Sequence, residues 1–331
     1  MAEEAIIIGA GVSGLTAAAR LRRSGHSALV LEKSRGLGGR AATRRWSGLP
    51  VDHGAQFFTA RSDAFREQVA AWLSRGICRE WTRGFHQYAG GRLSQADGDN
   101  HPRYACAQGM SALGRALAGD GEARVERMAK ATEIRRGSCA WEIACEDGRV
   151  FNARALILTC PPPQGAELLG AAAPEASALL RGIGMNPCLA VAASFPRREI
   201  GWCGIQCEDA VVSWVGHDTS KRPGLHEGRT VVVVHASAEF SRSRYGAAEE
   251  EVIATLLARA SEISGEDLRS RQEVFLQRWR YAQPVAAKES PAALLFGEKS
   301  PLLLAGECFA GGKIEGAWLS GAAAARQLAG G

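Results

Sequence analysis

A glycine pattern near the start of the chain constrains its fold more than any other feature. The pattern GxGxxG directly follows the apolar run at residues 5–8 and opens an amphipathic segment at residues 14–24, and a second apolar run covers residues 28–32. Its glycines are Gly9, Gly11 and Gly14. Strand, glycine turn, helix and strand in this order predict a βαβ unit with a right-handed crossover, which begins the parallel sheet of an α/β fold.

This unit has the chemistry of a dinucleotide site. Gly9 permits a tight turn, Gly11 lets backbone N–H groups approach a pyrophosphate, and Gly14 lets the helix pack on the strand. Glu32 ends the second strand, where a carboxylate accepts hydrogen bonds from both ribose hydroxyls of an adenine nucleotide and repels a 2′-phosphate. A plain glycine turn with a surface glutamate is the alternative. The further contacts predicted on this unit are Val12, Ser13 and Lys33.

A second glycine-rich loop follows directly, with the sequence GLGGR at residues 36–40. Gly39 and Arg40 suit a second contact to a diphosphate, because a guanidinium donates two parallel hydrogen bonds to phosphate oxygens. A flexible basic loop is the alternative.

The composition is that of an ordinary globular protein. The 331 residues carry a formal net charge of +5, with 46% hydrophobic and 23% charged residues, which argues against disorder and against a nucleic-acid-binding tail. The nine cysteines are scattered, which favours a reducing compartment over a disulfide framework. The pair Cys203 and Cys207 lacks a second set of ligands, so we predict no metal site. No run reaches the ~18 apolar residues of a membrane span, and we expect a cytoplasmic protein without membrane or nucleic-acid partners.

The rest of the chain predicts strands between amphipathic helices. The helices are expected at residues 62–74 and 249–263, where apolar residues recur at helical spacing. Strands are expected at residues 139–145, 149–151, 155–159, 188–195, 211–215, 230–235, 273–279 and 302–305, and an Ala-rich helix at residues 316–328. The Asp-Gly turn at residues 147–148 joins two of these strands, so the middle of the chain is expected to be rich in antiparallel sheet, and prolines between the strands indicate crossings between two domains.

A second pattern lies near the C-terminus. Residues 305–307 (AGE) end an apolar strand, and residues 315–321 (EGAWLSG) open the last helix. Together with the two glycine motifs and Glu32, this pattern resembles the flavoprotein class that contains the amine oxidases, phytoene desaturases and renalases. Residues 52–58 (DHGAQFF) are similar to the GAQ(Y/F)F segment of renalases, especially bacterial ones. Shorter matches follow in order at residues 109–111, 220–223, 235–237 and 278–282.

The resemblance implies a Rossmann-like FAD-binding domain interleaved with a second α+β substrate domain that contains a mostly antiparallel sheet. The expected division is residues 1–61, 103–165 and 285–331 for the FAD-binding domain and residues 62–102 and 166–284 for the substrate domain. The class binds the ribityl chain through an acidic residue, here Glu307, and its last helix faces the flavin pyrimidine oxygen. The flavin contacts implied in this way are Gly54, Ala55, Gln56, Phe57, Gly306, Glu307, Glu315, Gly316 and Ala317.

The resemblance also implies an activity. Renalases oxidise the 2- and 6-dihydro isomers of NAD(P)H by hydride transfer to flavin N5, and O2 then reoxidises the flavin with formation of H2O2. A small dinucleotide and O2 are therefore the expected partners. FAD is expected to be non-covalent, because Lys313 stands after the glycine pair where some amine oxidases carry a flavin-bonded cysteine. The chain has one dinucleotide fingerprint, so reduction must come from a substrate at the flavin face. A flavin amine oxidase and a non-catalytic FAD-binding redox sensor are the alternatives.

Five side chains are candidates for the substrate face of the flavin. Gln56 hydrogen-bonds the flavin edge or a substrate carboxamide, or is a satisfied loop amide. His235 faces the substrate or is a core histidine. Trp279 and Tyr281 share one strand face and either stack on a nicotinamide ring or fill the core. Trp214 has apolar neighbours, which favour a core role.

Two cations stand close to these candidates in the chain. Lys221 and Arg222 precede a proline and are expected in a loop, where they meet substrate phosphates or form a solvated basic turn.

Overall fold

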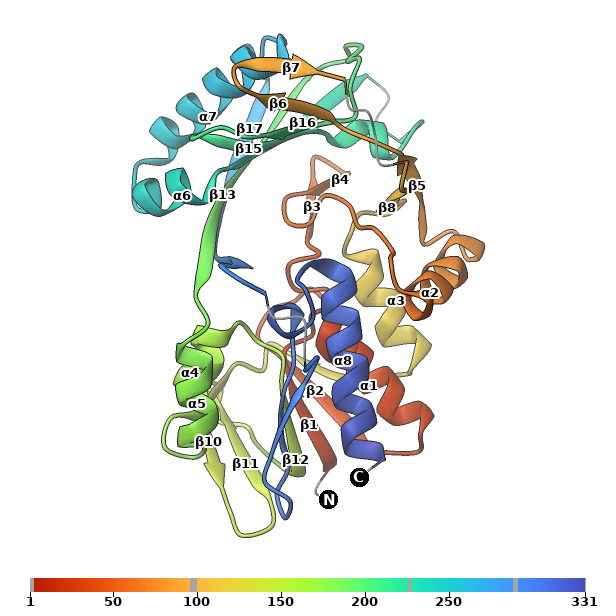
Figure 1. The fold of residues 1–331 in the computed structure, drawn as a ribbon, viewed down its shortest axis with the longest axis vertical. Coiled ribbons are helices and arrows are strands. Elements are labelled where there is room, and N and C mark those ends of the chain that lie inside the picture. Colours follow the sequence, from red (N-terminus) through yellow and green to blue (C-terminus); the bar gives the residue numbers. More distant parts are fainter. Residues whose placement is uncertain (1–2, 96–99, 226–227, 288–290, 331) are drawn as a thin grey trace.

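The computed structural model describes every residue except 1–2, 96–99, 226–227, 288–290 and 331, and it divides into two layered regions (Figure 1). The first region is built on an eight-stranded sheet in the order β10-β11-β12-β1-β2-β9, to which β19 and β18 are added beside β12. Its strands are β1 (Glu3–Ile8), β2 (Ala28–Glu32), β9 (Arg124–Arg127), β10 (Ala131–Arg136), β11 (Trp141–Cys145), β12 (Val150–Leu158), β18 (Leu294–Phe296) and β19 (Leu302–Leu304). The predicted βαβ unit is present, because β1 and β2 pair in parallel and are joined by α1 (Val12–Arg23).

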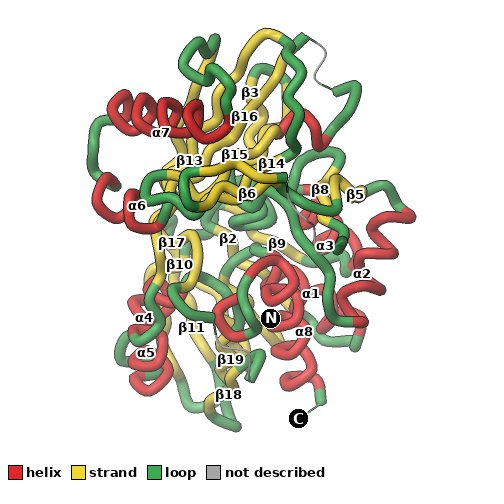
Figure 2. Tube along the Cα trace, turned by 45° about the horizontal axis from the view of Figure 1, so that its top comes forward, coloured by secondary structure: helices red, strands yellow, loops and turns green. Residues whose placement is uncertain are grey.

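Side chains of the central strands alternate between two cores, one on each face of this sheet. Ile7 and Val30 pack with α1, α2 (Asp63–Ser74), α3 (Ala112–Asp120) and α8 (Lys313–Ala329). Ile6 and Leu29 pack on the opposite face with α4 (Pro162–Leu169) and α5 (Pro174–Arg181), and Figure 2 shows these two helices on the other side of the sheet from α1 and α8. Burial on both faces explains why the central parallel strands read as continuous apolar runs.

The second region is a seven-stranded sheet in the order β17-β13-β16-β15-β14-β6-β7. Its strands are β6 (His86–Ala89), β7 (Arg92–Ser94), β13 (Met185–Pro196), β14 (Gly204–Cys207), β15 (Val212–His217), β16 (Arg229–Ala236) and β17 (Glu273–Pro284). Every neighbouring pair is antiparallel except β14 with β6. The helices α6 (Ala238–Arg244) and α7 (Glu249–Ser264) cover its outer face (Figure 1). The predicted α/β class with a mostly antiparallel second sheet is therefore confirmed.

Two small two-stranded sheets connect the regions. One is β3 (Thr43–Trp46) with β4 (Leu49–Asp52), and the other is β5 (Cys78–Thr82) with β8 (Arg103–Cys106). Val51 packs against Val231, Val233 and Phe275, so the first hairpin lies under the inner face of the second sheet. The predicted domain boundaries stay a prediction. Helix α2 packs in the same core as α1 and α8 through Phe65 and Trp72.

Candidate functional site

The GxGxxG turn forms an open cradle at the carboxyl end of β1. A Cβ at Gly14 would overlap the carbonyl oxygen of Gly9, so the helix packs as closely on the strand as the pattern predicts. A Cβ at Gly11 would meet nothing within 4 Å, and Gly11 is bridged to Gly38 of the second glycine loop. We call Gly9, Gly11, Ser13, Gly14 and Gly39 the glycine cradle.

The cradle fits the diphosphate of a dinucleotide such as FAD. The helix α1 begins with no side-chain cap at Gly11, and its N-terminus carries the positive end of the helix dipole. The hydroxyl of Ser13 is buried and has no hydrogen-bond partner among the described residues. An orphaned hydroxyl and open backbone at a helix N-terminus are what an anionic ligand would satisfy.

Glu32 lies at the edge of this cradle. One carboxylate oxygen accepts a hydrogen bond from the backbone N–H of Ala10 at 2.8 Å. The other accepts from the backbone N–H and the hydroxyl of Ser34 at 2.7 and 2.6 Å. The carboxylate is therefore held beside the turn, while its contact with ribose stays a prediction. Lys33 is exposed next to it.

Arg40 and Glu307 form a bidentate ion pair, in which two guanidinium nitrogens donate to the two carboxylate oxygens. Arg40 also donates to the carbonyl oxygen of Ala282 on β17 at 3.2 Å, so it joins both regions of the molecule. The side chain of Glu307 is 12% exposed and that of Arg40 is 27% exposed. The residues predicted for the diphosphate and the ribityl chain thus meet at one place, next to Gly306.

The N-terminus of α8 is the third element of this site. Gly316 packs on the carbonyl of Ala310 so closely that a Cβ would overlap it, and Ala317 is half-buried beside it. The side chain of Glu315 points elsewhere: its oxygens accept from the backbone N–H groups of Arg61 and Ser62 at 3.0 and 2.7 Å. It therefore holds the two residues that precede α2, and its predicted flavin contact stays a prediction.

The segment after β4 carries Gln56, whose amide is buried. Its nitrogen donates to the carbonyl oxygens of Asp52 at 2.6 Å and Gly54 at 3.1 Å, and its oxygen accepts from Lys221 at 3.0 Å. The nitrogen also lies 3.4 Å from Nε2 of His235. The neighbouring Ala55 is held by a 2.9 Å hydrogen bond to the carbonyl of Arg40, which brings this segment to the glycine loop.

His235 lies against this amide, and His53 of the same segment forms a stacked pair with Trp279. Burial, with Lys221 and His53 nearby, lowers the pKa of His235 to about 3, and burial lowers the pKa of His53 to about 4. The ring of His53 stacks on Trp279 with centroids 5.4 Å apart, and the indole N–H donates to the carbonyl of His53 at 2.9 Å. Both imidazoles are therefore neutral at pH 7. Sequence reasoning did not single out His53, although it lies within the segment DHGAQFF.

Two other candidates lie further out. Trp214 is 6% exposed and packs in an aromatic cluster with Phe57, Trp81 and Phe85, which is the core role that its apolar neighbours favoured. Phe57 packs in the same cluster. Tyr281 is half-buried on β17, at the register shift between the pairs Cys188–Trp279 and Asn186–Gln283. The catalytic roles of all five candidates stay predictions.

Lys221 and Arg222 correct the sequence analysis. They lie at the 3₁₀ turn η1 (Asp218–Lys221), where both side chains are buried and paired with Asp52 and Asp218. We call these four residues the buried charge cluster. Neither cation forms the expected solvated turn or phosphate contact, because both are buried and form ion pairs with the carboxylates of the cluster.

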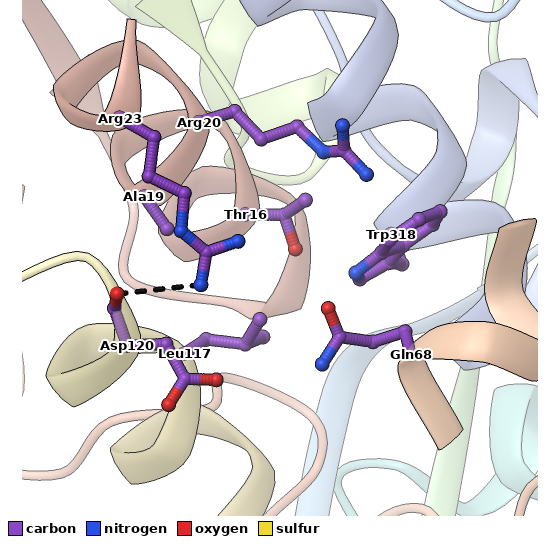
Figure 3. Close-up of a pocket in the computed structure, with 8 residues that line it drawn as sticks. All are labelled: Thr16, Ala19, Arg20, Arg23, Gln68, Leu117, Asp120 and Trp318. Atoms are coloured by element: carbon purple, nitrogen blue, oxygen red, sulfur yellow. Dashed lines mark hydrogen bonds between the residues drawn. The ribbon is translucent and has the colours of Figure 1, made fainter. Parts of the chain in front are cut away.

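A separate cavity of about 10 Å³ lies between α1, α2, α3 and α8 (Figure 3). The guanidinium of Arg20 lies 4.8 Å from the centre of the Trp318 ring, and Arg23 donates to the carbonyl of Asp120. Its lining contains none of the predicted site residues. No three His, Cys, Asp or Glu side chains of the described residues are arranged to hold a metal ion. None of the described helices is long and apolar enough to cross a membrane.

Comparison with known proteins agrees with this geometry. Residues 7–73 match the family described as NAD(P)-binding Rossmann-like domain, and residues 76–329 match the family described as flavin containing amine oxidoreductase. A Mycobacterium tuberculosis protein named as a flavin-containing monoamine oxidase, AofH, is 43% identical over 61 residues, which are 18% of this chain and 13% of that protein. The lysine-specific histone demethylase 1 homolog 3 of Arabidopsis thaliana is 50% identical over 58 residues, which are 17% of this chain and 4% of that protein.

Solved structures are similar over the whole chain. A protein described as a protoporphyrinogen oxidase from Exiguobacterium sp. 255-15 has a TM-score of 0.78 at 14% identity and covers 99% of both chains. Cyclohexylamine oxidase from Brevibacterium oxydans has a TM-score of 0.76 at 13% identity and covers 100% of this chain and 99% of its own. At these identities the likeness concerns the fold. The family match at residues 76–329 spans most of the sequence, so this chain belongs to the flavin containing amine oxidoreductases, and non-covalently held FAD is its cofactor.

Proposed function

We propose that the protein is an FAD-dependent oxidase of 2- or 6-dihydro isomers of NAD(P)H. In this reaction a C–H bond of the dihydropyridine ring breaks, and hydrogen and both bonding electrons move to flavin N5, which leaves NAD(P)⁺. Two electrons and two protons then convert O2 to H2O2. The observation that carries this proposal is a set of uncharged side chains, in which Gln56 lies against the neutral ring of His235 and Trp279 stacks on the neutral ring of His53.

This set of side chains suits a dihydropyridine ring that carries a carboxamide. The ring is flat and uncharged, so it can stack on an indole such as Trp279 without an ionic partner. The carbonyl oxygen of the carboxamide needs a donor, which a neutral imidazole supplies. Hydride transfer requires no general acid or base from the protein, and FAD provides the electron acceptor. The residues of this chain would orient the ring and exclude water.

A flavin amine oxidase is the second candidate, because the family match and the fold neighbours include amine oxidases. A substrate ammonium is favoured by a free carboxylate. The carboxylates closest to Gln56, those of Asp52 and Asp218, are both paired with Lys221 and Arg222. Oxidation of the amine free base by hydride transfer needs no such carboxylate, so the choice between these functions is one for experiment.

Anaerobic mixing of the FAD-loaded enzyme with each reductant tests this proposal. The reductants are 2-dihydro-NAD, 6-dihydro-NAD, ordinary NADH, cyclohexylamine and putrescine, and flavin bleaching is followed by stopped-flow absorbance. We expect one dihydro isomer to bleach the flavin at least about a hundredfold faster than NADH or the amines, and admission of O2 to restore the spectrum with H2O2 formed. Fast bleaching by an amine would move the assignment to an amine oxidase. Slow bleaching by every reductant would favour a redox sensor.

A further inference from the structure

Lys221 is completely buried, and besides its two ion pairs it donates a hydrogen bond to an uncharged side chain. Its ammonium lies 2.8 Å from Asp218 and 3.4 Å from Asp52, and Arg222 pairs with the same two carboxylates. Two cations therefore already balance two anions. The third donor of the ammonium goes to the side-chain oxygen of Gln56 at 3.0 Å.

This contact fixes the orientation of the Gln56 amide. An ammonium only donates hydrogen bonds, so the amide oxygen must face Lys221. The amide nitrogen then faces the carbonyl oxygens of Asp52 and Gly54, which only accept. The reversed amide would set its oxygen against these carbonyls and its N–H groups against the ammonium. Lys221 comes from η1 after β15, whereas Gln56 follows β4, so the two regions of the molecule meet in this bond.

The fixed amide decides which nitrogen of His235 carries the proton. Nε2 of His235 lies 3.4 Å from the amide nitrogen, which has no lone pair to accept a hydrogen bond. The two hydrogens of this nitrogen are shared between the imidazole ring and the carbonyl oxygens of Asp52 and Gly54. A protonated Nε2 would set hydrogen against hydrogen, so the lone pair must face the amide. Burial and the nearby ammonium also disfavour a second proton on the ring. The neutral ring therefore carries its proton on Nδ1.

We propose that Lys221 is a positioning residue, which holds the Gln56 amide so that its N–H meets Nε2 of His235 and keeps the imidazole proton on Nδ1. The inference rests on the proposed function only in taking His235 and Gln56 as residues of the substrate face. An imidazole set in this way has one free donor and no free acceptor. It suits the carbonyl oxygen of a carboxamide and does not suit the N–H of an amine.

The nitrogen resonances of His235 test the proposal without any substrate. The FAD-loaded enzyme is labelled with 15N-histidine, and its signals are assigned by their loss in His235→Gln. We expect a single tautomer with a pyrrole-type Nδ1 and a pyridine-type Nε2, and we expect Lys221→Met to give averaged shifts of both tautomers. An Nε2-protonated ring in the parent overturns the proposal. An unchanged Nδ1–H tautomer in Lys221→Met overturns it as well.

Lys221→Met leaves two carboxylates with one guanidinium, so a balanced variant accompanies it. In Lys221→Met/Asp218→Asn the cluster keeps Arg222 with Asp52, and the same averaging of tautomers is expected at retained FAD content. The control is Lys130→Met, which removes an ion pair with Glu146 whose side chains are 53% and 64% exposed. The control should keep the tautomer of the parent.

A double-mutant cycle separates positioning from general stabilisation. With any reductant that bleaches the flavin rapidly, Lys221→Met should slow reduction about tenfold when Gln56 is present and less than about twofold in the Gln56→Leu background. Equal slowing in both backgrounds would show that Lys221 acts by another route. If no dihydro isomer reduces the flavin, the proposed function fails, whereas the tautomer result still decides the role of Lys221.

Discussion

The glycine cradle and the buried charge cluster both hold functional groups in place, but the sequence encodes them over different ranges. The cradle is made by residues 9–14 and 36–40 and depends on the absence of side chains. The charge cluster joins Asp52 to residues 166, 169 and 170 positions away and depends on charged side chains with almost no exposed surface. A short motif can therefore specify the cradle alone, whereas the cluster exists only when the two regions of the molecule have docked.

The largest effect is expected from a methyl group in the cradle. Gly14→Ala places a Cβ on the carbonyl oxygen of Gly9 and pushes α1 off β1. FAD affinity should fall more than about a hundredfold, because the backbone N–H groups no longer converge on the diphosphate. Equilibrium FAD titration measures it. Gly119→Ala in α3 is the control, since its Cβ meets nothing within 4 Å. Unchanged FAD affinity in Gly14→Ala would show that the cradle does not hold the cofactor.

The charge cluster should respond in stability before it responds in cofactor binding. Arg222→Met leaves Asp52 and Asp218 buried with a single cation, and breaking a buried ion pair in this way costs about 3–5 kcal/mol. Urea unfolding should show a free energy of unfolding lower by that amount. Lys130→Met breaks an exposed pair, and such pairs contribute about 0–1 kcal/mol. Equal losses of unfolding free energy in the two variants would mean that the buried ion pairs contribute no more to stability than the exposed pair.

Glu32 sharpens the comparison, because it lies at the edge of the cradle and carries a charge. Glu32→Ala should lower FAD affinity by roughly ten- to a hundredfold, since charge-assisted hydrogen bonds to the ribose are lost. At saturating FAD the rate of flavin reduction should stay within about threefold of the parent, because no contact with the reacting atoms is removed. A collapsed rate at full FAD occupancy would give Glu32 a role beyond cofactor binding.

The smallest effect concerns pH and His235. The pKa of His235 is about 3 in the folded protein and near 6.5 in the unfolded chain, so the unfolded state binds more protons between these values. The free energy of unfolding therefore rises with pH across this window. The contribution of His235 is fully present above the window and is lost as pH falls toward 3. His235→Gln should make the melting temperature depend less steeply on pH between about 4 and 6.5. An unchanged slope would show that His235 is not buried as a neutral ring.

The sequence predicts the parts of this molecule that depend on neighbours in the chain. The strand–turn–helix unit around Gly9, Gly11 and Gly14 and the helix over residues 62–74 are confirmed, because their signals are local spacing and apolar periodicity. The hairpins β3–β4 and β6–β7 were not anticipated. Their strands are only three or four residues long, so they carry little apolar periodicity.

The candidate site shows where local signals end. Lys221 and Arg222 look like a basic turn in the sequence. Their common partner Asp52 lies 169 and 170 positions away. His53 has no signal of its own, because its stacking partner Trp279 is brought to it by the second sheet. The sequence also gives no sign that Glu315 binds the residues just before α2, since Ser62 precedes it by 253 positions.

The two longest strands of the molecule limit how its regions can move. β13 and β17 each have 12 residues, pair in antiparallel fashion from Met185 with Pro284 to Ser194 with Glu273, and form the ribbon that leads into the second sheet (Figure 1). Wide hinge opening would have to bend this ribbon and break its interstrand hydrogen bonds. Twisting along the ribbon is the motion with the lower energetic cost. Ligand exchange by a small rotation of one region over the other would leave β17, the strand that carries Trp279, intact during turnover.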